Sequence, residues 1–237
     1  SMDGARALAA AGRPRARAAI IGEPTSLNPV RLHKGIMMEA IEVTGLAGHS
    51  SNPALGVNAL DVMHELMSEM MQFRHQLATE HANSAFEVAF PTLNLGCIHG
   101  GDSPNRICGR CELHFDLRLT PSAAAAGVRE QLQQRLQTLA HARGARIALR
   151  SLVEPVPPFE QPANSELVRL AEKLTGHSAL AVGFATEAPF LQAIGMETIV
   201  MGPGSIDRAH QPDEYLELSQ IQPCVDLLQS CIAHYCL

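Results

Sequence analysis

A short loop that carries one histidine and several carboxylates is the first segment of the sequence suited to chemistry. Residues 202–215 follow the strand-forming run 197–201 and begin Gly-Pro-Gly-Ser. Two glycines and a proline directly after a strand predict a tight loop at the carboxyl end of that strand, which is where α/β proteins bind ligands. His210 lies in this loop, so a ring nitrogen is available to a metal while a carboxylate orients the ring from behind. The neighbouring carboxylates are Asp207, Asp213 and Glu214. A solvated polar loop with a surface histidine is the plainer alternative.

A further carboxylate follows the first predicted strand. Residues 18–21 read Ala-Ala-Ile-Ile, which predicts a short buried strand, and Gly-Glu-Pro-Thr-Ser at 22–26 ends it. Glu23 therefore lies at the mouth of a strand, a position suited to a site and poorly suited to a core. The alternative is a carboxylate that only caps a turn.

The composition is that of a globular protein with an acidic balance. The 237 residues are enough for one large domain or two small ones, and 46% of them are hydrophobic while 18% are charged. Eighteen basic and 24 acidic side chains give a formal charge of -6, so no basic field is available to hold nucleic acid or an anionic membrane. We therefore expect a small-molecule or protein partner, with no nucleic acid and no membrane.

The apolar runs and the cysteines indicate a cytoplasmic protein. No run approaches the roughly 20 apolar residues that cross a bilayer, and the first residues lack the basic-then-apolar order of a signal peptide. Cys108 and Cys111 come closest to the spacing of a zinc knuckle, but residues 107–115 alternate as a strand does. We expect reduced, mostly buried thiols. The six cysteines are Cys97, Cys108, Cys111, Cys224, Cys231 and Cys236.

Between residues 33 and 152 the apolar periodicity predicts the order β-α-β-β-α-β. Strands are predicted at 36–44, 86–95, 107–119 and 146–152, and helices at 59–77 and 122–142. A four-stranded antiparallel sheet with two helices on one face satisfies this order. The methionines of the first helix are expected to be packing residues rather than a cofactor site. They are Met63, Met67, Met70 and Met71.

The remaining sequence predicts an α/β layer. Residues 155–159, Pro-Val-Pro-Pro-Phe, cannot form a helix and mark a boundary. Beyond them we predict strands at 180–182 and 197–201 and helices at 165–174, 187–191 and 221–235. The first strand has no sheet unless it joins this layer. The sequence thus predicts one α/β domain in two segments, 1–32 and 153–237, interrupted by an inserted ferredoxin-like α+β domain at 33–152.

Six short motifs occur in order along the chain. They are residues 22–26, 48–51 with 56–59, 92–96, 105–108, 186–190, and 202–205 through 209–215. Together they resemble the acetylornithine deacetylases, which are co-catalytic zinc enzymes of the aminoacylase and peptidase family M20; this family also includes succinyl-diaminopimelate desuccinylase. The resemblance covers the whole chain. It implies a partial zinc-peptidase-like α/β catalytic domain with an inserted lid and dimerisation domain.

The resemblance also implies a metal centre. By position, Glu23 matches the carboxylate ligand of one zinc ion and His210 the histidine ligand of the other, in a site of two Zn²⁺ ions that Co²⁺ can replace. A His-x-Asp motif, a bridging Asp and a Glu-Glu pair that supplies the general base belong to the family's N-terminal half and are absent from this sequence. Because catalytic zinc normally needs three protein ligands, we expect the chain alone to bind zinc weakly and to be inactive.

Five further residues match functional positions of the family. His49 is expected to reach into the active site of the partner in a dimer and to donate to the developing oxyanion, with an exposed turn histidine as the alternative. Asn94, Asn105 and Arg106 match substrate contacts, and Arg106 is suited to a substrate carboxylate. Glu187 matches a residue that binds the α-amino group of ornithine; the alternative is a helix N-terminal carboxylate of local use.

The function that the resemblance implies is metal-dependent hydrolysis of N2-acetyl-L-ornithine to L-ornithine and acetate in arginine biosynthesis. The expected partners are an acylated amino acid and a second copy of the chain, paired through the lid domain. Residues 186–190 and 33–35 favour the deacetylase over a desuccinylase or another acyl-amino-acid hydrolase. A non-catalytic dimerisation or ligand-binding module is an alternative of a different class.

Overall fold

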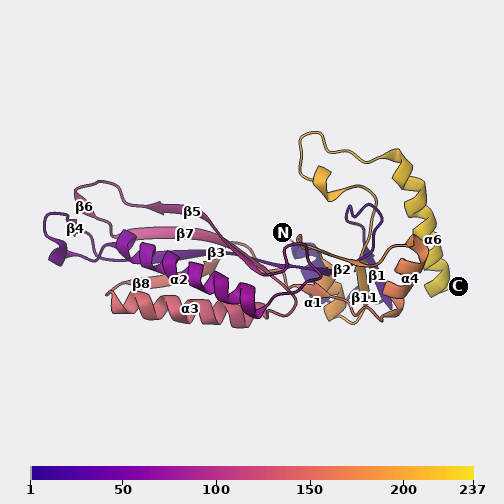
Figure 1. Cartoon of the computed structure of the whole chain (residues 1–237), viewed down its shortest axis with the longest axis horizontal. Coiled ribbons are helices and arrows are strands. Elements are labelled where there is room, and N and C mark those ends of the chain that lie inside the picture. Colours follow the sequence, from indigo (N-terminus) through magenta and orange to yellow (C-terminus); the bar gives the residue numbers. More distant parts are fainter. Residues whose placement is uncertain (1) are drawn as a thin grey trace. The chain divides into compact units, whose positions relative to one another are not determined.

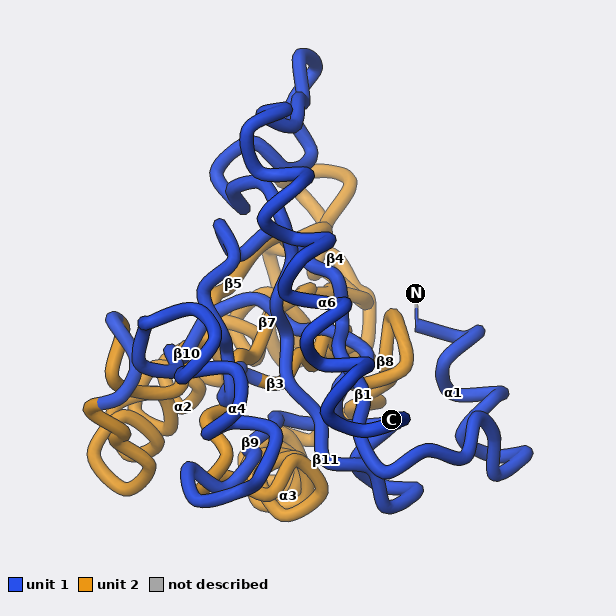
Figure 2. The backbone as a smooth tube through the Cα atoms, turned by 90° about the vertical axis from the view of Figure 1, so that its right-hand side faces the viewer, with its two compact units in different colours: residues 1–34, 85–87, 156–237 blue, residues 35–84, 88–155 orange. Residues whose placement is uncertain are grey.

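A computed structural model describes residues 2–237 and shows a chain that forms two compact units. Unit 1 comprises the chain up to Lys34, residues 85–87 and residues 156–237. Unit 2 comprises residues 35–84 and 88–155. Figure 2 draws unit 1 in blue and unit 2 in orange. Each unit has its own sheet and its own buried core.

Unit 2 contains a four-stranded antiparallel sheet, in the order β5-β7-β3-β8, and two long helices (Figure 1). The strands are β3 (Gly35–Thr44), β5 (Thr92–Gly100), β7 (Arg110–Leu119) and β8 (Arg146–Ser151), and the helices are α2 (Ala59–Glu80) and α3 (Ala125–Ala142). Strands β3 and β7 pair along their whole length, from Gly35 opposite Leu119 to Thr44 opposite Arg110. The predicted order β-α-β-β-α-β is confirmed.

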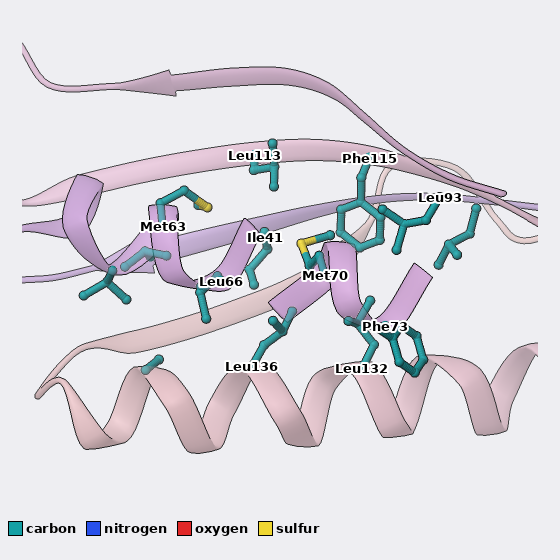
Figure 3. Packing of buried hydrophobic residues seen from close by; sticks show 14 of the residues in the cluster. Ile41, Met63, Leu66, Met70, Phe73, Leu93, Leu113, Phe115, Leu132 and Leu136 are labelled. Atoms are coloured by element: carbon teal, nitrogen blue, oxygen red, sulfur yellow. The ribbon is translucent and has the colours of Figure 1, made fainter. Parts of the chain in front are cut away.

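The core of unit 2 consists of apolar side chains from the sheet and from helices α2 and α3 (Figure 3). Strand β7 buries every second residue, so one face of the sheet is apolar and the other polar. The α2 residues at helical spacing that meet this face are buried. They are Ala59, Val62, Met63, Leu66, Met70, Phe73 and Leu77. The packing role predicted for the methionines holds for Met63, Met67 and Met70, but Met71 is 45% exposed.

Some predicted boundaries in unit 2 are wrong. Strand β5 begins at Thr92 rather than at Phe86, because Pro91 has no N–H for a ladder and Phe86 is buried in unit 1, where the Lys34 ammonium lies 5.7 Å from its ring centroid. The strand predicted at 107–119 is interrupted at Cys108 and Gly109. Its first residues form β6 (Arg106–Ile107), which pairs with β4 (Gly48–His49) as a separate ribbon.

Unit 1 contains a five-stranded mixed sheet. Its strands are β1 (Ala18–Ile21), β2 (Val30–His33), β9 (Phe159–Glu160), β10 (Leu180–Val182) and β11 (Glu197–Val200), in the order β1-β11-β2-β10 with β9 also paired to β2. Strand β1 runs parallel to β11, and β10 runs parallel to β2. The first strand thus joins the α/β layer. It was predicted to be buried but is only half-buried, because it forms one end of the sheet.

Within residues 2–237, unit 1 contains four α-helices, and capping residues define the ends of α4. They are α1 (Asp3–Ala10), α4 (Glu166–Thr175), α5 (Ala188–Ala193) and α6 (Ile221–Cys236), with short 3-10 turns η2 (Ile206–Arg208) and η3 (Leu218–Gln220); a further turn, η1 (Pro53–Leu55), belongs to unit 2. The Ser165 hydroxyl accepts the Val168 N–H and starts α4, while Gly176, at φ 74°, ends it. The Glu197 carboxylate also accepts the Leu167 N–H at 2.8 Å, so β11 and α4 are tied together.

All six cysteines are free thiols. Cys108, Cys111 and Cys231 are buried, whereas Cys97 and Cys236 are exposed, so the expectation of mostly buried thiols holds for half of them. Burial raises the pKa of the Cys111 and Cys231 thiols, which keeps both protonated and unreactive at neutral pH. Among residues 2–237, no helix combines the length and the apolar character that a membrane span requires.

Two neighbouring methionines test the account of the unit 2 core. Met70 is fully buried and Met71 is 45% exposed on the same helix. We expect Met70→Ala to lower the free energy of unfolding by about 2–5 kcal/mol, because it removes buried volume, and Met71→Ala to change it by less than about 1 kcal/mol. Urea denaturation followed by circular dichroism measures both. Equal losses for the two variants would contradict the assigned faces of α2.

Candidate functional site

The loops that follow β1 and β11 are bonded to each other through their main chains. Because the two strands are parallel neighbours, both end at one edge of the sheet. There the Thr25 and Leu27 N–H groups donate to the Gly202 carbonyl oxygen at 3.2 and 2.9 Å, and the Ser26 N–H donates to the Gly204 carbonyl oxygen at 2.6 Å. The Gly202 N–H donates in turn to the Thr25 hydroxyl. This edge is therefore one connected structure rather than two separate loops.

The connection requires unusual backbone conformations. Ser26 and Leu27 are left-handed, at φ 53° and 62°, which ordinary side chains seldom adopt. A Cβ atom at position 202 would lie 2.6 Å from the Glu23 carbonyl oxygen, so only glycine allows this approach. Such strain persists only where surrounding bonds enforce it, and it gathers at functional sites.

Glu23, directly after β1, lies within electrostatic range of both Glu187 and His210. Burial raises the pKa of the Glu23 carboxyl above its usual 4.5, the Glu187 carboxylate raises it further, and His210 lowers it. Burial without a neutralising partner disfavours a carboxylate, and a second carboxylate nearby adds to the cost. The other two candidate residues of unit 1, Glu187 and His210, thus both act electrostatically on the Glu23 carboxyl.

His210 is exposed and has a left-handed backbone, at φ 61°. The sequence predicted that a carboxylate orients the His210 ring, and Glu214 makes a different contact. The Glu214 carboxylate accepts the backbone N–H of His210 at 3.0 Å and so fixes the main chain instead. The Gln211 side-chain amide donates to the Asp207 carbonyl oxygen at 2.6 Å and closes the same loop. The loop holds the position of the His210 backbone through its own bonds.

Glu187 precedes α5 and occupies its N-cap position. Its side chain makes no capping hydrogen bond to that helix. Its place at the N-terminus of α5 still fits the alternative of a helix N-terminal carboxylate, while its negative charge also raises the pKa of Glu23.

The residues of this edge do not complete a metal site. Among residues 2–237, no group of three His, Cys, Asp or Glu side chains is placed so that it can hold a metal ion. A catalytic zinc ion normally has three protein ligands. Glu23 and His210 are chemically suitable ligands, but a two-zinc centre does not fit on the described part of the chain alone.

The three candidates of the β4–β6 ribbon in unit 2 lie together. His49 pairs with Arg106 in that ribbon, and the Ser50 N–H donates to the Asn105 carbonyl oxygen at 3.1 Å. The Ser51 N–H donates to His49 Nδ1 at 3.2 Å, and the Ser51 hydroxyl lies 2.7 Å from the same nitrogen. Nδ1 is therefore an acceptor, which places the proton of the neutral ring on Nε2. The exposed His49 ring thus presents an Nε2–H donor.

The other candidates of unit 2 already have local partners. Arg106 pairs with Asp102 at 2.6 Å, so a substrate carboxylate would compete with Asp102 for this guanidinium. The Asn105 side-chain oxygen accepts the Ser103 hydroxyl at 2.6 Å. Asn94 is exposed on β5, opposite Asp116, and belongs to the four-stranded sheet rather than to the ribbon.

Sequence reasoning gave no role to His33, which the structure buries completely at the end of β2. Its Nε2 lies 3.3 Å from the Thr186 nitrogen and its Nδ1 lies 2.9 Å from the Lys34 carbonyl oxygen. Burial lowers the pKa of His33 to about 4. In the sequence, His33 only ends the run Val-Arg-Leu-His. A single histidine beside apolar residues forms no pattern from which its role could be predicted.

Comparisons with known proteins place these features in context. The peptidase dimerisation domain family matches residues 31–143. Acetylornithine deacetylase of Edwardsiella ictaluri is 48% identical over 236 residues, covering 100% of this chain and 61% of that protein. The enzymes of the same name from Pasteurella multocida and Aliivibrio fischeri are 44% and 46% identical, each over 100% of this chain and 62% of the relative. The chain thus spans about three fifths of the length of these relatives.

Solved structures support the fold. Aminopeptidase PepT of Bacillus cereus has a TM-score of 0.72 at 15% identity, over 98% of this chain and 61% of that one. A tripeptidase of Staphylococcus aureus has a TM-score of 0.71 at 18% identity, over 94% of this chain and 58% of that one. The chain therefore has part of a mixed α/β, peptidase-like fold.

Charge substitutions test the grouping of Glu23, Glu187 and His210. We expect Glu187→Gln to lower the pKa of Glu23, because it removes a nearby negative charge, and His210→Ala to raise it, because it removes a positive one. An NMR pH titration of the Glu23 side-chain carboxyl carbon measures both shifts. Glu217→Gln is the matched control, since Glu217 is not among the causes of the shift. Shifts no larger than that of the control would mean that these side chains do not lie together.

Proposed function

The chain is homologous over its whole length to acetylornithine deacetylases, and from this premise we propose that it is part of a metal-dependent amidohydrolase that cleaves N2-acetyl-L-ornithine to L-ornithine and acetate. The 44–48% identity across the entire chain is the observation that carries the proposal. The charge grouping of Glu23, Glu187 and His210 supports it. The corresponding role is in arginine biosynthesis in the cytoplasm.

The two units have different proposed roles. We assign residues 1–32 and 153–237 to a peptidase-like catalytic domain and residues 33–152 to a ferredoxin-like lid and dimerisation domain. The match of residues 31–143 to a peptidase dimerisation domain supports the second assignment. The β-α-β-β-α-β order of unit 2 agrees with it. The proposed protein partner is a second copy of the chain.

The proposed cofactor of the complete protein is a pair of Zn²⁺ ions, which Co²⁺ can replace. Bound zinc supplies Lewis-acid chemistry to amide hydrolysis. Glu23 and His210 are the residues of this chain that we assign to it as ligands. The described residues do not complete the set, so further ligands must come from outside them.

The chain's own side chains account for binding and for one catalytic contact. We assign the His49 Nε2–H as a donor to the amide oxygen, which gains negative charge as the carbon becomes tetrahedral. Arg106, Asn94 and Asn105 are assigned to the polar groups of the substrate, with the carboxylate at Arg106. Glu187 is assigned to the substrate's ammonium group, because its carboxylate does not cap α5.

Two alternative functions can be distinguished from the proposed one by experiment. A desuccinylase or another acyl-amino-acid hydrolase would use the same residues with a different acyl group, and the names of the most similar relatives favour the deacetylase. A non-catalytic dimerisation or ligand-binding module is the alternative that the incomplete ligand set favours.

Activity assays test the proposed function. Among residues 2–237, no three His, Cys, Asp or Glu side chains are placed to hold a metal ion. We therefore expect the purified chain to hydrolyse N2-acetyl-L-ornithine no faster than its His210→Ala variant at any zinc concentration. A longer protein that contains this chain and the remaining length of the relatives should hydrolyse it faster than N-succinyl-diaminopimelate. Preference for the succinyl substrate would select the desuccinylase, and inactivity towards all acyl-amino acids would select the binding module.

Mixed dimers of that longer protein test whether His49 acts in the partner subunit. His210→Ala should lower both zinc content and rate, whereas His49→Ala should leave zinc bound and lower kcat by about 10²–10³. In a dimer of one chain of each kind, one active site carries both lesions and the other is intact, so we expect about half of the wild-type activity. Subunit exchange followed by an activity assay measures this recovery. Proven heterodimers that stay inactive would show that His49 serves its own subunit.

A further inference from the structure

His33 connects the two sequence segments that favour a deacetylase, residues 33–35 and 186–190. The imidazole is fully buried at the end of β2 and packs on Phe159, with ring centroids 5.3 Å apart. Both ring nitrogens meet main-chain groups. Nε2 lies 3.3 Å from the Thr186 nitrogen, and Nδ1 lies 2.9 Å from the Lys34 carbonyl oxygen. The ring therefore joins β2 to the segment that leads into α5.

These contacts define one protonation state. The Thr186 N–H is a donor, so Nε2 accepts it and carries no proton. The Lys34 carbonyl oxygen is an acceptor, so Nδ1 carries the proton and donates it. The ring is a neutral imidazole with its proton on Nδ1. Burial, which disfavours the charged ring, acts in the same direction.

The same contacts hold the residue before Glu187. The Lys34 N–H donates to the Val182 carbonyl oxygen at 3.2 Å, so β2 bonds both ends of the short segment 182–186. Thr186 is buried, and its hydroxyl accepts the Ala188 N–H at 3.1 Å in the first turn of α5. The backbone of Glu187 is thereby fixed on its N-terminal side by His33 and on its C-terminal side by the helix.

We propose that His33 is a positioning residue: by accepting the Thr186 N–H, its neutral ring fixes the backbone that carries Glu187 and thereby sets recognition of the ammonium group of the substrate. The inference rests on the function proposed above for Glu187. A neutral imidazole suits this task because it accepts at one end and donates at the other while its faces remain apolar. A residue that only filled space would not need to satisfy both main-chain groups.

Substitutions that keep or remove the acceptor test this role in the longer, active protein. His33→Leu retains apolar bulk and removes the acceptor, whereas the amide oxygen of His33→Gln can still accept the Thr186 N–H. We expect His33→Leu to raise KM for N2-acetyl-L-ornithine about tenfold with little change in kcat, since a binding contact is weakened, and His33→Gln to stay within about threefold of wild type.

A double-mutant cycle with Glu187 separates positioning from packing. Glu187→Gln should raise KM by a similar factor, and adding His33→Leu to it should raise KM no further, because both changes act through one carboxylate. KM effects that multiply in the double variant, or a fall in kcat at unchanged KM, would overturn the inference. Absence of N2-acetyl-L-ornithine hydrolysis in the unsubstituted protein is a different result, which refutes the proposed function instead.

A measurement on the unsubstituted chain does not depend on variants that fold. Nitrogen-15 NMR of the His33 ring at neutral pH should show a protonated Nδ1 and an unprotonated Nε2. The Thr186 amide should show a scalar coupling to Nε2 across the hydrogen bond, or slow hydrogen exchange. A ring with its proton on Nε2, or a Thr186 amide that exchanges as fast as those of exposed loops, would overturn the proposed contact.

Discussion

The main-chain hydrogen bonds between residues 25–27 and the glycine loop 202–204 are the constraint on which unit 1 depends. Strands β1 and β11 pair over only four residues each, so sheet pairing alone would leave their loops free to move. The crossing bonds hold Ser26 and Leu27 in left-handed conformations that cost about 1–3 kcal/mol each. They also bring Gly202 against the carbonyl of Glu23. The backbone of Glu23 is thus fixed by its neighbours rather than by its own side chain.

Unit 2 depends on apolar packing rather than on hydrogen bonds between loops. Its stability comes from apolar side chains between one face of the sheet and helices α2 and α3, and none of its candidate site residues belongs to that core. His49, Asn105 and Arg106 lie instead in the β4–β6 ribbon region, where glycines allow close backbone contact. A Cβ atom at Gly56 would overlap the Leu46 carbonyl oxygen. Gly56 therefore allows the close backbone contact beside the ribbon that carries these candidate residues, while the core supplies a rigid support.

The sequence predicted the long elements and those short strands that read as apolar runs, such as β1, β10 and β11, but not the shortest ones. Helix α2 and strand β7 extend over enough residues for their periods of 3.6 and 2 to be recognised, and both were predicted within a few residues. Strands β4, β6 and β9 have two residues each, so they have no period and exist only through their partners. The charge grouping of Glu23 with His210 was expected only from resemblance, because residues so far apart in sequence meet through strand pairing.

Three histidines illustrate why residue type alone does not define a role. His49 and His210 are exposed, the first with its Nδ1 bonded locally and the second on a strained backbone, so each presents ring atoms outward. His33 is enclosed, and its pKa falls from 6.5 to about 4. Between these values the unfolded chain binds a proton that the folded chain does not, so folding stability rises with pH across this window. The contribution is on the order of 3 kcal/mol, complete above pH 6.5 and lost as the pH falls towards 4. Neutrality at working pH is therefore a condition of the fold around Thr186, and the same condition keeps the ring an acceptor for the residue that precedes Glu187.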